Sequence, residues 1–365
     1  MRVMLVCYDY SRCGGCERVA HNLYKELSSK LDIYIVSLYK SKEVCSLDDE
    51  FVKYLLCRNG SFLKDAISLF RQLVRLIKLF SVDIIVSVGV NASFYVTIAS
   101  RLLGLKSVIC EHSNISNNLY NTRKQMIKRG LVIPLCTRFV TLTESDKDEY
   151  EKRYPRYKSK FTSIYNWIDI NSEQINHHYN ILSHKIITIC RIDRVKSIER
   201  SITIFKKIQK YASDWTWEIY GEGDEQYLNE LTTMVDKEGL SNFYFRGFIK
   251  EPNNVYKEAA IYACTSLYEG LPVSLLEAKS WHIPIISFDC KTGPSEIIMN
   301  NINGYLIDEG NVDEFACLLK KLIIDDYLRM EFSRHSYENI EKFSKDHITN
   351  KWVELFRVVI NNECN

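Results

Sequence analysis

Short apolar runs that alternate with helical stretches are the feature that most limits what this chain can fold into. In the first half, the runs with the composition of buried strands are Arg2–Tyr8, Ile33–Leu38, Ile84–Val88, Ser107–Cys110 and Phe139–Thr143. The same alternation repeats from about residue 180 to about residue 340. Because strands that are separated by helices pair in parallel, the pattern predicts an α/β fold with parallel sheets.

The length of the chain allows two domains. It has 365 residues, of which 46% are apolar, and this is enough for two separate cores. The segment Ile170–Ser183 is polar, as expected of a linker, so we predict one domain over residues 1–170 and another over residues 171–345. In the remaining part, residues 346–365, helical spacing indicates an amphipathic packing helix with Ile348, Trp352, Leu355, Phe356 and Val359 on its apolar side.

A turn followed by a helix is expected within residues 266–278. Gly270 permits a positive φ at the turn. Ser274 and Glu277 match the S-x-x-E capping box, which predicts a helix that begins near Leu275. The free N–H groups and the dipole at such a helix start suit an anion such as a diphosphate.

Two carboxylates flank this helix start. Glu269 lies on the loop eight positions before Glu277. Glu269 could accept hydrogen bonds from sugar hydroxyls, and Glu277 could accept them from ribose hydroxyls once a ligand displaces it from its capping role. The alternative is that Glu277 only caps the helix and that Glu269 is a solvated loop acid.

Two cations follow the expected buried strand Lys185–Cys190. The carboxyl ends of strands are where open α/β sheets bind ligands, so Arg191 and Lys196 are candidates for a phosphate site. The alternative for such a pair is an ordinary solvated surface. Strands followed by glycine recur at Trp215–Gly223 and Phe245–Ile249, which makes a chance arrangement a poor explanation.

Taken in order, these motifs resemble those of the family-4 retaining glycosyltransferases of the GT-B fold. The matching pieces are Cys13–Val19, Glu111–Asn114, Tyr165–Asp169, Arg191 with Lys196, Gly221–Gly223, Gly247–Ile249, Glu269–Glu277, and Gly293–Glu296 with Gly304. The resemblance implies two Rossmann-like domains that face an interdomain cleft, with the acceptor on the N-terminal domain and the nucleotide sugar on the C-terminal domain. It also implies a C-terminal helix that crosses back and packs on the N-terminal domain.

The resemblance assigns roles to residues of this sequence. In the N-terminal domain, Gly14 and Gly15 would let the loop approach the donor closely, and His112 would face the sugar and the reacting bond. A lone histidine at a strand end is otherwise more often structural. Arg191 and Lys196 would neutralise the departing diphosphate.

The same resemblance assigns the rest of the donor site. Glu269 would hold the hydroxyls of the donor sugar and Glu277 the ribose, while the backbone near Phe248 and Ile249 would receive the nucleobase. The loop and helix start would complete the donor site with Gly270, Leu271, Val273 and Ser274.

The acceptor site rests on one departure from the family pattern. Family members often carry proline after the asparagine of the Tyr-Asn segment, where this chain has Trp167. We therefore expect Asn166 and Trp167 to offer a surface on which acceptor sugars stack.

Neither a metal nor a cofactor is expected. The sequence Asp146-Lys-Asp148 has the D-x-D spacing of metal-dependent glycosyltransferases, but its surroundings predict an acidic helix N-terminus. Cys13 and Cys16 form a C-x-x-C pair with no second pair at metal spacing, so zinc is not expected. The scattered cysteines, the lack of a secretory signal and the lack of an apolar run of roughly 18 to 20 residues favour a cytoplasmic protein that does not cross a membrane.

The net charge of +2 hides an asymmetry. Residues 1–170 hold 26 Lys and Arg against 17 Asp and Glu, whereas residues 171–365 hold 22 against 29. One basic group on an expected helix is Lys64, Arg71, Arg75 and Lys78, beside an apolar stripe of Leu63, Ile67, Phe70, Val74 and Ile77. A second basic group is Arg123, Lys124, Lys128 and Arg129.

This basic bias has two explanations. One is a pair of solvated helices packed on their own core. The other is attachment to the anionic inner face of the cytoplasmic membrane, which a lipid-linked acceptor would explain. Nucleic acid is not expected, because no binding motif for it is present.

The resemblance thus implies a metal-independent retaining glycosyltransferase. It would move a hexose or N-acetylhexosamine from a UDP-sugar to a growing, lipid-linked surface polysaccharide such as O-antigen or capsule. The acceptor proton could pass to the leaving diphosphate on the same face, or the reaction could use a covalent intermediate. The alternatives are a UDP-sugar epimerase of the same fold and a catalytically silent scaffold of a glycan assembly complex.

Overall fold

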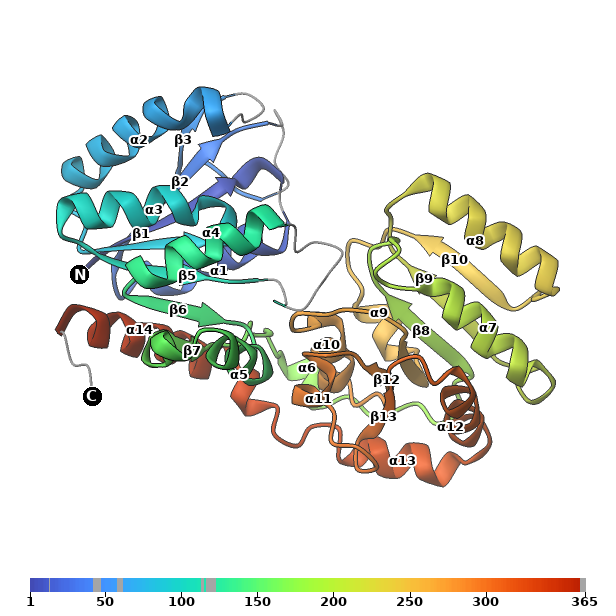
Figure 1. Cartoon of the computed structure of the whole chain (residues 1–365). Coiled ribbons are helices and arrows are strands. Elements are labelled where there is room, and N and C mark those ends of the chain that lie inside the picture. The colour runs from blue at the N-terminus through green and yellow to red at the C-terminus, as the bar shows by residue number, and fades with distance from the viewer. Residues whose placement is uncertain (13, 42–46, 58–61, 113–114, 116–122, 362–365) are drawn as a thin grey trace. The chain divides into compact units, whose positions relative to one another are not determined.

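A computed structural model of the chain describes residues 1–12, 14–41, 47–57, 62–112, 115 and 123–361. The chain forms two compact units (Figure 1). Unit 1 comprises Met1–Asn166 and Asp346–Asn365, and unit 2 comprises Trp167–Lys345. The boundary therefore falls four residues before the expected position, and the C-terminal helix belongs to unit 1.

Unit 1 contains a seven-stranded parallel sheet in the order β3-β2-β1-β4-β5-β6-β7. Its strands are β1 (Arg2–Asp9), β2 (Asp32–Tyr39), β3 (Val52–Leu56), β4 (Ile84–Val88), β5 (Lys106–Cys110), β6 (Arg138–Thr141) and β7 (Phe161–Ser163). The strand order reverses between β1 and β4, which is the kind of place where such sheets bind ligands. The five predicted strands are confirmed, whereas the short edge strands β3 and β7 were not predicted.

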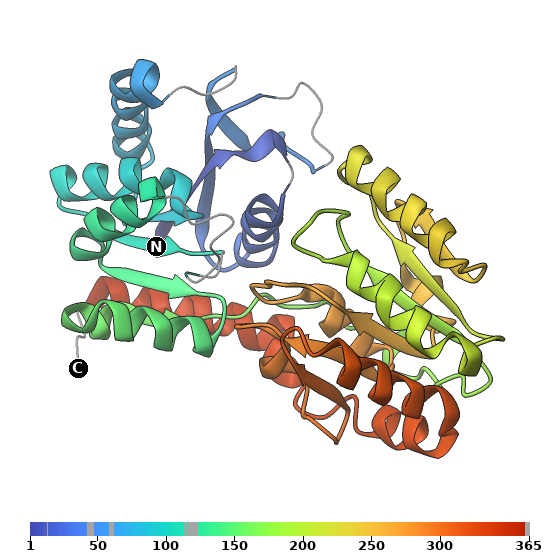
Figure 2. The same cartoon turned by 45° about the vertical axis from the view of Figure 1, so that its right-hand side comes forward.

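Helices cover both faces of this sheet. They are α1 (Gly15–Leu27), α2 (Phe62–Leu79), α3 (Val90–Leu103), α4 (Arg123–Leu135), α5 (Glu144–Arg153) and α14 (Lys345–Asn361), with short 3-10 turns at Tyr10–Arg12 and Pro155–Lys160. Figure 1 shows α2, α3 and α4 side by side over one face, and the turned view of Figure 2 shows α1 on the other. In Figure 2, α14 runs along the β6–β7 edge of the sheet.

The buried stripe of α2 differs from the predicted one. Leu69, Leu73 and Ile77 face the core, whereas Ile67 is 70% exposed. The sequence predicted the wrong stripe because α2 is apolar on more than one side. The side chains of Leu63 and Lys64 lie outside the described part of the helix.

Unit 2 contains a six-stranded parallel sheet in the order β10-β9-β8-β11-β12-β13. Its strands are β8 (Lys185–Ile189), β9 (Thr216–Tyr220), β10 (Phe243–Gly247), β11 (Ile261–Cys264), β12 (Ile285–Asp289) and β13 (Gly304–Asp308). Here the order reverses between β8 and β11, which pair through Ile186 with Ile261 and Ile187 with Tyr262. A second topological switch point therefore lies at the carboxyl ends of these two strands.

The helices of unit 2 surround its sheet and include one in the predicted linker. They are α6 (Ser172–Ile175), α7 (Ile198–Ile208), α8 (Glu225–Glu238), α9 (Asn253–Lys257), α10 (Val273–Ser280), α11 (Pro294–Ile297), α12 (Val312–Ile324) and α13 (Asp326–Arg334), with 3-10 turns at Gln209–Tyr211 and Glu341–Phe343. In α6, Asn171 caps the helix by accepting a hydrogen bond from the N–H of Gln174. No helix in the described ranges is long and apolar enough to cross a membrane.

Candidate active site

The loops after β8 and β11 in unit 2 are joined by an ion pair. Lys196 Nζ lies 2.7 Å from Glu269 Oε1, and both side chains are largely buried, with 22% and 11% exposed. Burial alone would lower the pKa of Lys196, but the carboxylate of Glu269 outweighs it and holds that pKa above its ordinary value. Lys196 therefore carries its charge at neutral pH at the switch point of the sheet.

Arg191 lies closer to solvent than Lys196. Its side chain is 68% exposed, and its Nη2 lies 2.5 Å from Asp193 Oδ2. The other oxygen of Asp193 accepts a hydrogen bond from the N–H of Val195 at 3.1 Å. Asp193, which the sequence analysis did not single out, thus fixes the loop that carries both predicted phosphate-binding cations.

The start of α10 corrects the predicted capping box. The helix begins at Val273, with Pro272 rather than Ser274 at the cap position, and no side chain caps it in the described structure. The carboxylate of Glu277 instead accepts a hydrogen bond from Tyr256 Oη at 2.6 Å. The N–H groups of the first turn are therefore not covered by a capping side chain of the described residues.

Tyr256 is thus a site residue that the sequence analysis missed. It lies on α9, 21 positions before Glu277, and its own side chain is buried. No local pattern could have indicated this contact. Of the other predicted donor residues, Leu271 is buried, while Val273 and Ser274 are half-buried.

The glycines of the candidate site do different work from that expected. Gly270 is not among the described glycines with positive φ, whereas Gly293 has φ 101°. A Cβ on Gly293 would lie 2.4 Å from the carbonyl oxygen of Gly270. The hydroxyl of Thr292 donates a hydrogen bond to the carbonyl oxygen of Glu269 at 2.9 Å, so this second loop packs closely against the Glu269 loop and braces it.

The glycines after β9 also serve loop packing. A Cβ on Gly221 would lie 1.8 Å from the carbonyl oxygen of Cys190, and one on Gly223 would lie 2.0 Å from that of Ile192. Gly221 and Gly223 are therefore required because the loops after β8 and β9 touch through their backbones. Beyond the next strand, β10, the ring of Phe248 is 63% exposed and Ile249 is half-buried.

Unit 1 has a cavity of about 240 Å³ at the carboxyl ends of β4 and β5. It is lined by Cys16, Gly89, Val90, Asn91, Glu111, His112, Gln125 and Arg129. The Nε2 atom of His112 is buried and has no hydrogen-bond partner among the residues that the structure describes. Burial lowers the pKa of His112 to about 4, although Glu111 opposes the shift, so the imidazole is neutral at physiological pH.

Glu111 anchors the base of this cavity. Its Oε2 lies 2.8 Å from Arg129 Nε and accepts a hydrogen bond from Tyr150 Oη at 3.0 Å. Arg129 is 1% exposed, so its predicted membership of a surface basic group is wrong. The pairing places a charged network directly beside His112, where sequence reasoning expected only the histidine.

Gly14 and Gly15 begin α1. Gly14 is the cap residue with φ −80°, and its N–H donates to Glu17 Oε2 at 2.9 Å. A Cβ on Gly14 would lie 2.9 Å from that oxygen, whereas one on Gly15 would meet nothing within 4 Å. Cys13, Ser113 and Asn114 of the predicted motifs lie outside the described residues.

The predicted acceptor surface at Trp167 is wrong. Trp167 is 8% exposed at the beginning of unit 2, while Asn166 is half-buried at the end of the first segment of unit 1. The neighbouring N–H of Ile168 donates to the carbonyl oxygen of Phe343 at 3.1 Å, which ties this strand-like segment into unit 2. The indole ring is therefore a packing element rather than a stacking platform.

The predicted acidic helix N-terminus is present at α5. Thr143 caps the helix by accepting a hydrogen bond from the N–H of Asp146 at 3.0 Å. Asp146 is buried in the first turn. Within the part of the chain that the structure describes, no group of three or more His, Cys, Asp and Glu side chains could hold a metal ion.

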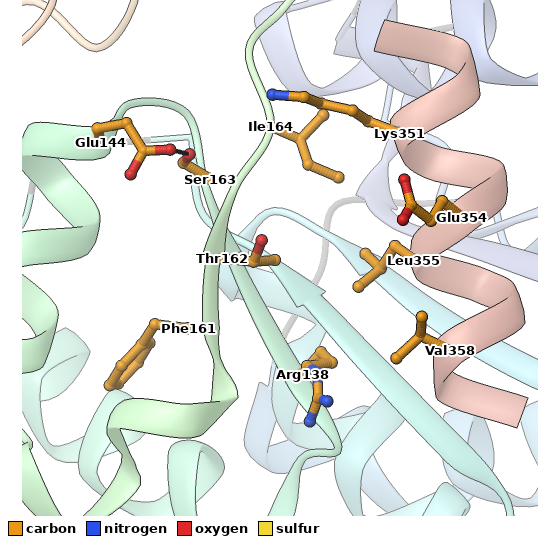
Figure 3. A pocket seen from close by; sticks show the side chains of 10 residues that line it. All are labelled: Arg138, Glu144, Phe161, Thr162, Ser163, Ile164, Lys351, Glu354, Leu355 and Val358. Atoms are coloured by element: carbon orange, nitrogen blue, oxygen red, sulfur yellow. Dashed lines mark hydrogen bonds between the residues drawn. The ribbon is translucent and has the colours of Figure 1, made fainter. Parts of the chain in front are cut away.

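A larger cavity of unit 1, of about 420 Å³, lies between β7 and α14 (Figure 3). Its lining carries both signs of charge, with Arg138 and Lys351 opposed by Glu144 and Glu354. Glu144 accepts a hydrogen bond from Ser163 across one wall. None of the predicted site residues lines this cavity, and it lies at the edge of the sheet, away from the switch point.

Comparison with known proteins gives two family matches that together cover most of the chain. The model of Glycosyltransferase Family 4 matches residues 13–172, and that of Glycosyl transferases group 1 matches residues 172–339. The amylovoran biosynthesis glycosyltransferase AmsD of Erwinia amylovora is 27% identical, over 97% of this chain and 99% of that protein.

Two further relatives span the full length. An alpha-1,4-N-acetyl-D-galactosaminyltransferase of Campylobacter jejuni, whose name specifies an acceptor linked to PP-undecaprenol, is 24% identical over 95% of this chain and 96% of its own. The crystal structure of Anabaena Alr3699/HepE in complex with UDP matches with a TM-score of 0.82 at 15% identity, over 98% of this chain and 100% of the other. These matches agree with the two parallel-sheet units described above.

Proposed function

Since the chain belongs to the family-4 glycosyltransferases of the GT-B fold, we propose that it transfers a hexose or N-acetylhexosamine from a UDP-sugar to a growing, lipid-linked surface polysaccharide such as O-antigen or capsule. The transfer retains the anomeric configuration and needs no metal ion. The observation that carries this proposal is the ion pair of Lys196 with Glu269 at the switch point of unit 2.

Lys196 supplies the charge that the leaving group needs. Negative charge develops on the diphosphate as the bond to the sugar breaks, and a fixed ammonium at that point lowers the barrier. Because Glu269 keeps Lys196 protonated, this stabilisation is present throughout the physiological pH range. Arg191, held by Asp193 on the same loop, adds a second cation, and we assign no metal ion to this step.

The carboxylates of unit 2 bind the hydroxyl groups of the donor. We assign the sugar hydroxyls to Glu269 and the ribose hydroxyls to Glu277, which Tyr256 holds in position at the first turn of α10. The uncapped N–H groups of that turn face the diphosphate in this assignment. The exposed ring of Phe248 and the backbone of Ile249 mark the place that we assign to the uracil base.

His112 orients the sugar and does not act as an acid. A neutral imidazole can donate or accept one hydrogen bond, but a pKa of about 4 leaves almost no imidazolium at neutral pH. The buried pair of Glu111 and Arg129 holds the adjacent backbone in place.

The choice of donor and acceptor draws on the relatives. HepE is solved in complex with UDP, AmsD is named for amylovoran biosynthesis, and the Campylobacter enzyme is named for an undecaprenol-linked acceptor. These names support a UDP-sugar as donor and a lipid-linked glycan as acceptor. Such an acceptor would bring the enzyme to the inner face of the cytoplasmic membrane.

The experiment that tests the proposal measures nucleotide release. The protein is incubated with UDP-, GDP- and ADP-sugars in EDTA, with and without a lipid-diphosphate sugar acceptor. We expect UDP release that requires the acceptor, persists in EDTA and yields a product with the anomeric configuration of the donor. Conversion of the sugar without acceptor would instead favour an epimerase, and silence of the folded protein across the panel would favour a scaffold.

A further inference from the structure

Helices α2, α3 and α4 form one continuous layer on a single face of the unit 1 sheet (Figure 1). Seven large apolar side chains are exposed in the described part of unit 1, and six of them belong to this layer. The six are Ile67, Leu79, Leu102, Ile127, Leu131 and Leu135, with 42 to 70% of each side chain exposed. The concentration of exposed aliphatic side chains on one face indicates an interaction surface.

The same layer carries cations without exposed carboxylates. Its exposed cations are Arg71, Arg75, Lys78, Arg101, Arg123 and Lys124, and Lys128 is half-buried. Neither α3 nor α4 contains an acidic residue. The acid of α2, Asp65, is 1% exposed and accepts a hydrogen bond from Tyr39. The outward charge of the three helices is therefore positive only.

Helix α4 presents two different sides. Gln125 and Arg129 line the His112 cavity. On the opposite side, Ile127 and Leu131 are exposed, with Lys124 and Lys128 interleaved between them at helical spacing. A single helix thus forms a wall of the candidate site on one side and an amphipathic surface on the other.

A basic cavity of about 430 Å³ adjoins the layer at the C-terminal ends of α3 and α4. Its lining includes four cations and no carboxylate: Arg101, Lys106, Arg138 and Lys160. Lys160 Nζ donates to the carbonyl oxygens of Ile133, Pro134 and Cys136 at 2.7 to 3.1 Å, so it offsets the negative end of α4. Lys106 and Arg138 add positive charge at the same edge.

We propose that the outer face of α2, α3 and α4 binds an anionic membrane surface. Aliphatic side chains such as Ile127 and Leu131 enter the headgroup region, and the surrounding cations contact lipid phosphates. The combination distinguishes this occupant from others, since nucleic acid offers no apolar region to match the aliphatic side chains. The inference goes beyond the proposed transfer reaction and rests on the surface alone.

The test is co-sedimentation of the full chain with lipid vesicles, in the absence of any sugar nucleotide. We expect binding to phosphatidylcholine mixed with phosphatidylglycerol, little binding to phosphatidylcholine alone, and weaker binding as salt is added. The variant Lys124→Gln/Lys128→Gln should bind anionic vesicles about 30-fold more weakly, from about fivefold for each cation removed. Ile127→Ser/Leu131→Ser should also lose binding, while its circular dichroism spectrum stays that of the wild type.

Matched controls remove the same groups elsewhere. Lys25→Gln/Lys30→Gln alters exposed cations of α1 and the turn after it, away from the α2–α4 layer. Leu182→Ser/Ile324→Ser alters exposed aliphatic side chains of unit 2. Both should bind vesicles as the wild type does, and so should Lys196→Ala, which separates this inference from the proposed catalysis. Equal affinity for neutral and anionic vesicles, binding to neither, or undiminished binding of the α4 variants would overturn the proposal.

Discussion

Lys196 and Glu269 form a 2.7 Å ion pair although 73 positions separate them in the sequence. The pair connects the loop after β8 with the loop after β11, which are neighbouring strands in the sheet of unit 2. It keeps an ammonium charged at the place where a diphosphate would leave, and it orients a carboxylate toward the same region. Its two members can be tested separately.

Replacement of Lys196 by alanine should abolish most of the transfer. Loss of one preorganised group that stabilises developing charge lowers kcat by about 10²- to 10³-fold. The rate of acceptor-dependent UDP release measures this. Lys185→Ala is the control, because Lys185 lies at the start of β8 and forms ion pairs with Glu218 and Glu258. Undiminished turnover of Lys196→Ala would remove Lys196 from the phosphate site.

Glu269→Ala should weaken the discrimination among donor sugars. The variant loses the carboxylate that we assign to sugar hydroxyls, so kcat/KM should fall most for the preferred sugar. Competition between UDP-glucose, UDP-galactose and their N-acetylated forms measures the ratio. Glu258→Ala, at an acid that is 65% exposed, should leave the ratio unchanged. The same selectivity in both variants would return Glu269 to the role of a loop acid.

Tyr256→Phe removes the hydroxyl that holds Glu277. We expect KM for the UDP-sugar to rise several-fold with little change in kcat, and the free energy of unfolding to fall by about 1 kcal/mol. Tyr179→Phe is a matched control, because its hydroxyl donates to the carbonyl oxygen of Ala260 at the start of β11. A rise in KM of equal size in the control would mean that the effect of Tyr256 is only structural.

His112 should make the protein less stable in mild acid. Its pKa is about 4 in the folded protein and ordinarily 6.5, so the unfolded chain binds more protons between these values. Stability therefore falls as pH drops through this window, by about 2 kcal/mol between pH 7 and pH 5 from this residue. Urea unfolding at both pH values measures the difference, which His112→Gln should reduce.

The control for this pH dependence is His335→Gln. His335 is exposed and pairs with Glu338 on the surface of unit 2. Its replacement should leave the loss of stability between pH 7 and pH 5 close to that of the wild type. The prediction for His112 fails if the wild type and His112→Gln lose stability equally.

Gly223→Ala should destabilise unit 2 and reduce transfer. Its Cβ would lie 2.0 Å from the carbonyl oxygen of Ile192, so the loops after β8 and β9 must move apart. We expect a loss of about 2 kcal/mol or more in the free energy of unfolding. Gly130→Ala, in α4 with no atom within 4 Å of the new Cβ, should instead be neutral or stabilising by up to about 1 kcal/mol.

The strands of both sheets could be predicted because their information is local. Buried runs such as Arg2–Tyr8 and Lys185–Cys190 are apolar on both faces, as strands between two helical layers must be. The edge strands β3 and β7 lack that signal, since Lys53 is exposed and β7 has only three residues. Predicted site residues such as Lys196 and Glu269 were indicated by motifs at strand ends, which mark the ligand edge of a parallel sheet.

By itself the sequence determined the fold class, the two-domain plan and the edge of each sheet where the site lies. Only the tertiary structure decided which of several local possibilities each side chain takes. Trp167 is buried, Arg129 pairs with Glu111, and Glu277 accepts from Tyr256 instead of capping its own helix. The reason is physical, because a buried charge or hydroxyl must find its partner in space, and that partner can lie on any element the fold brings near.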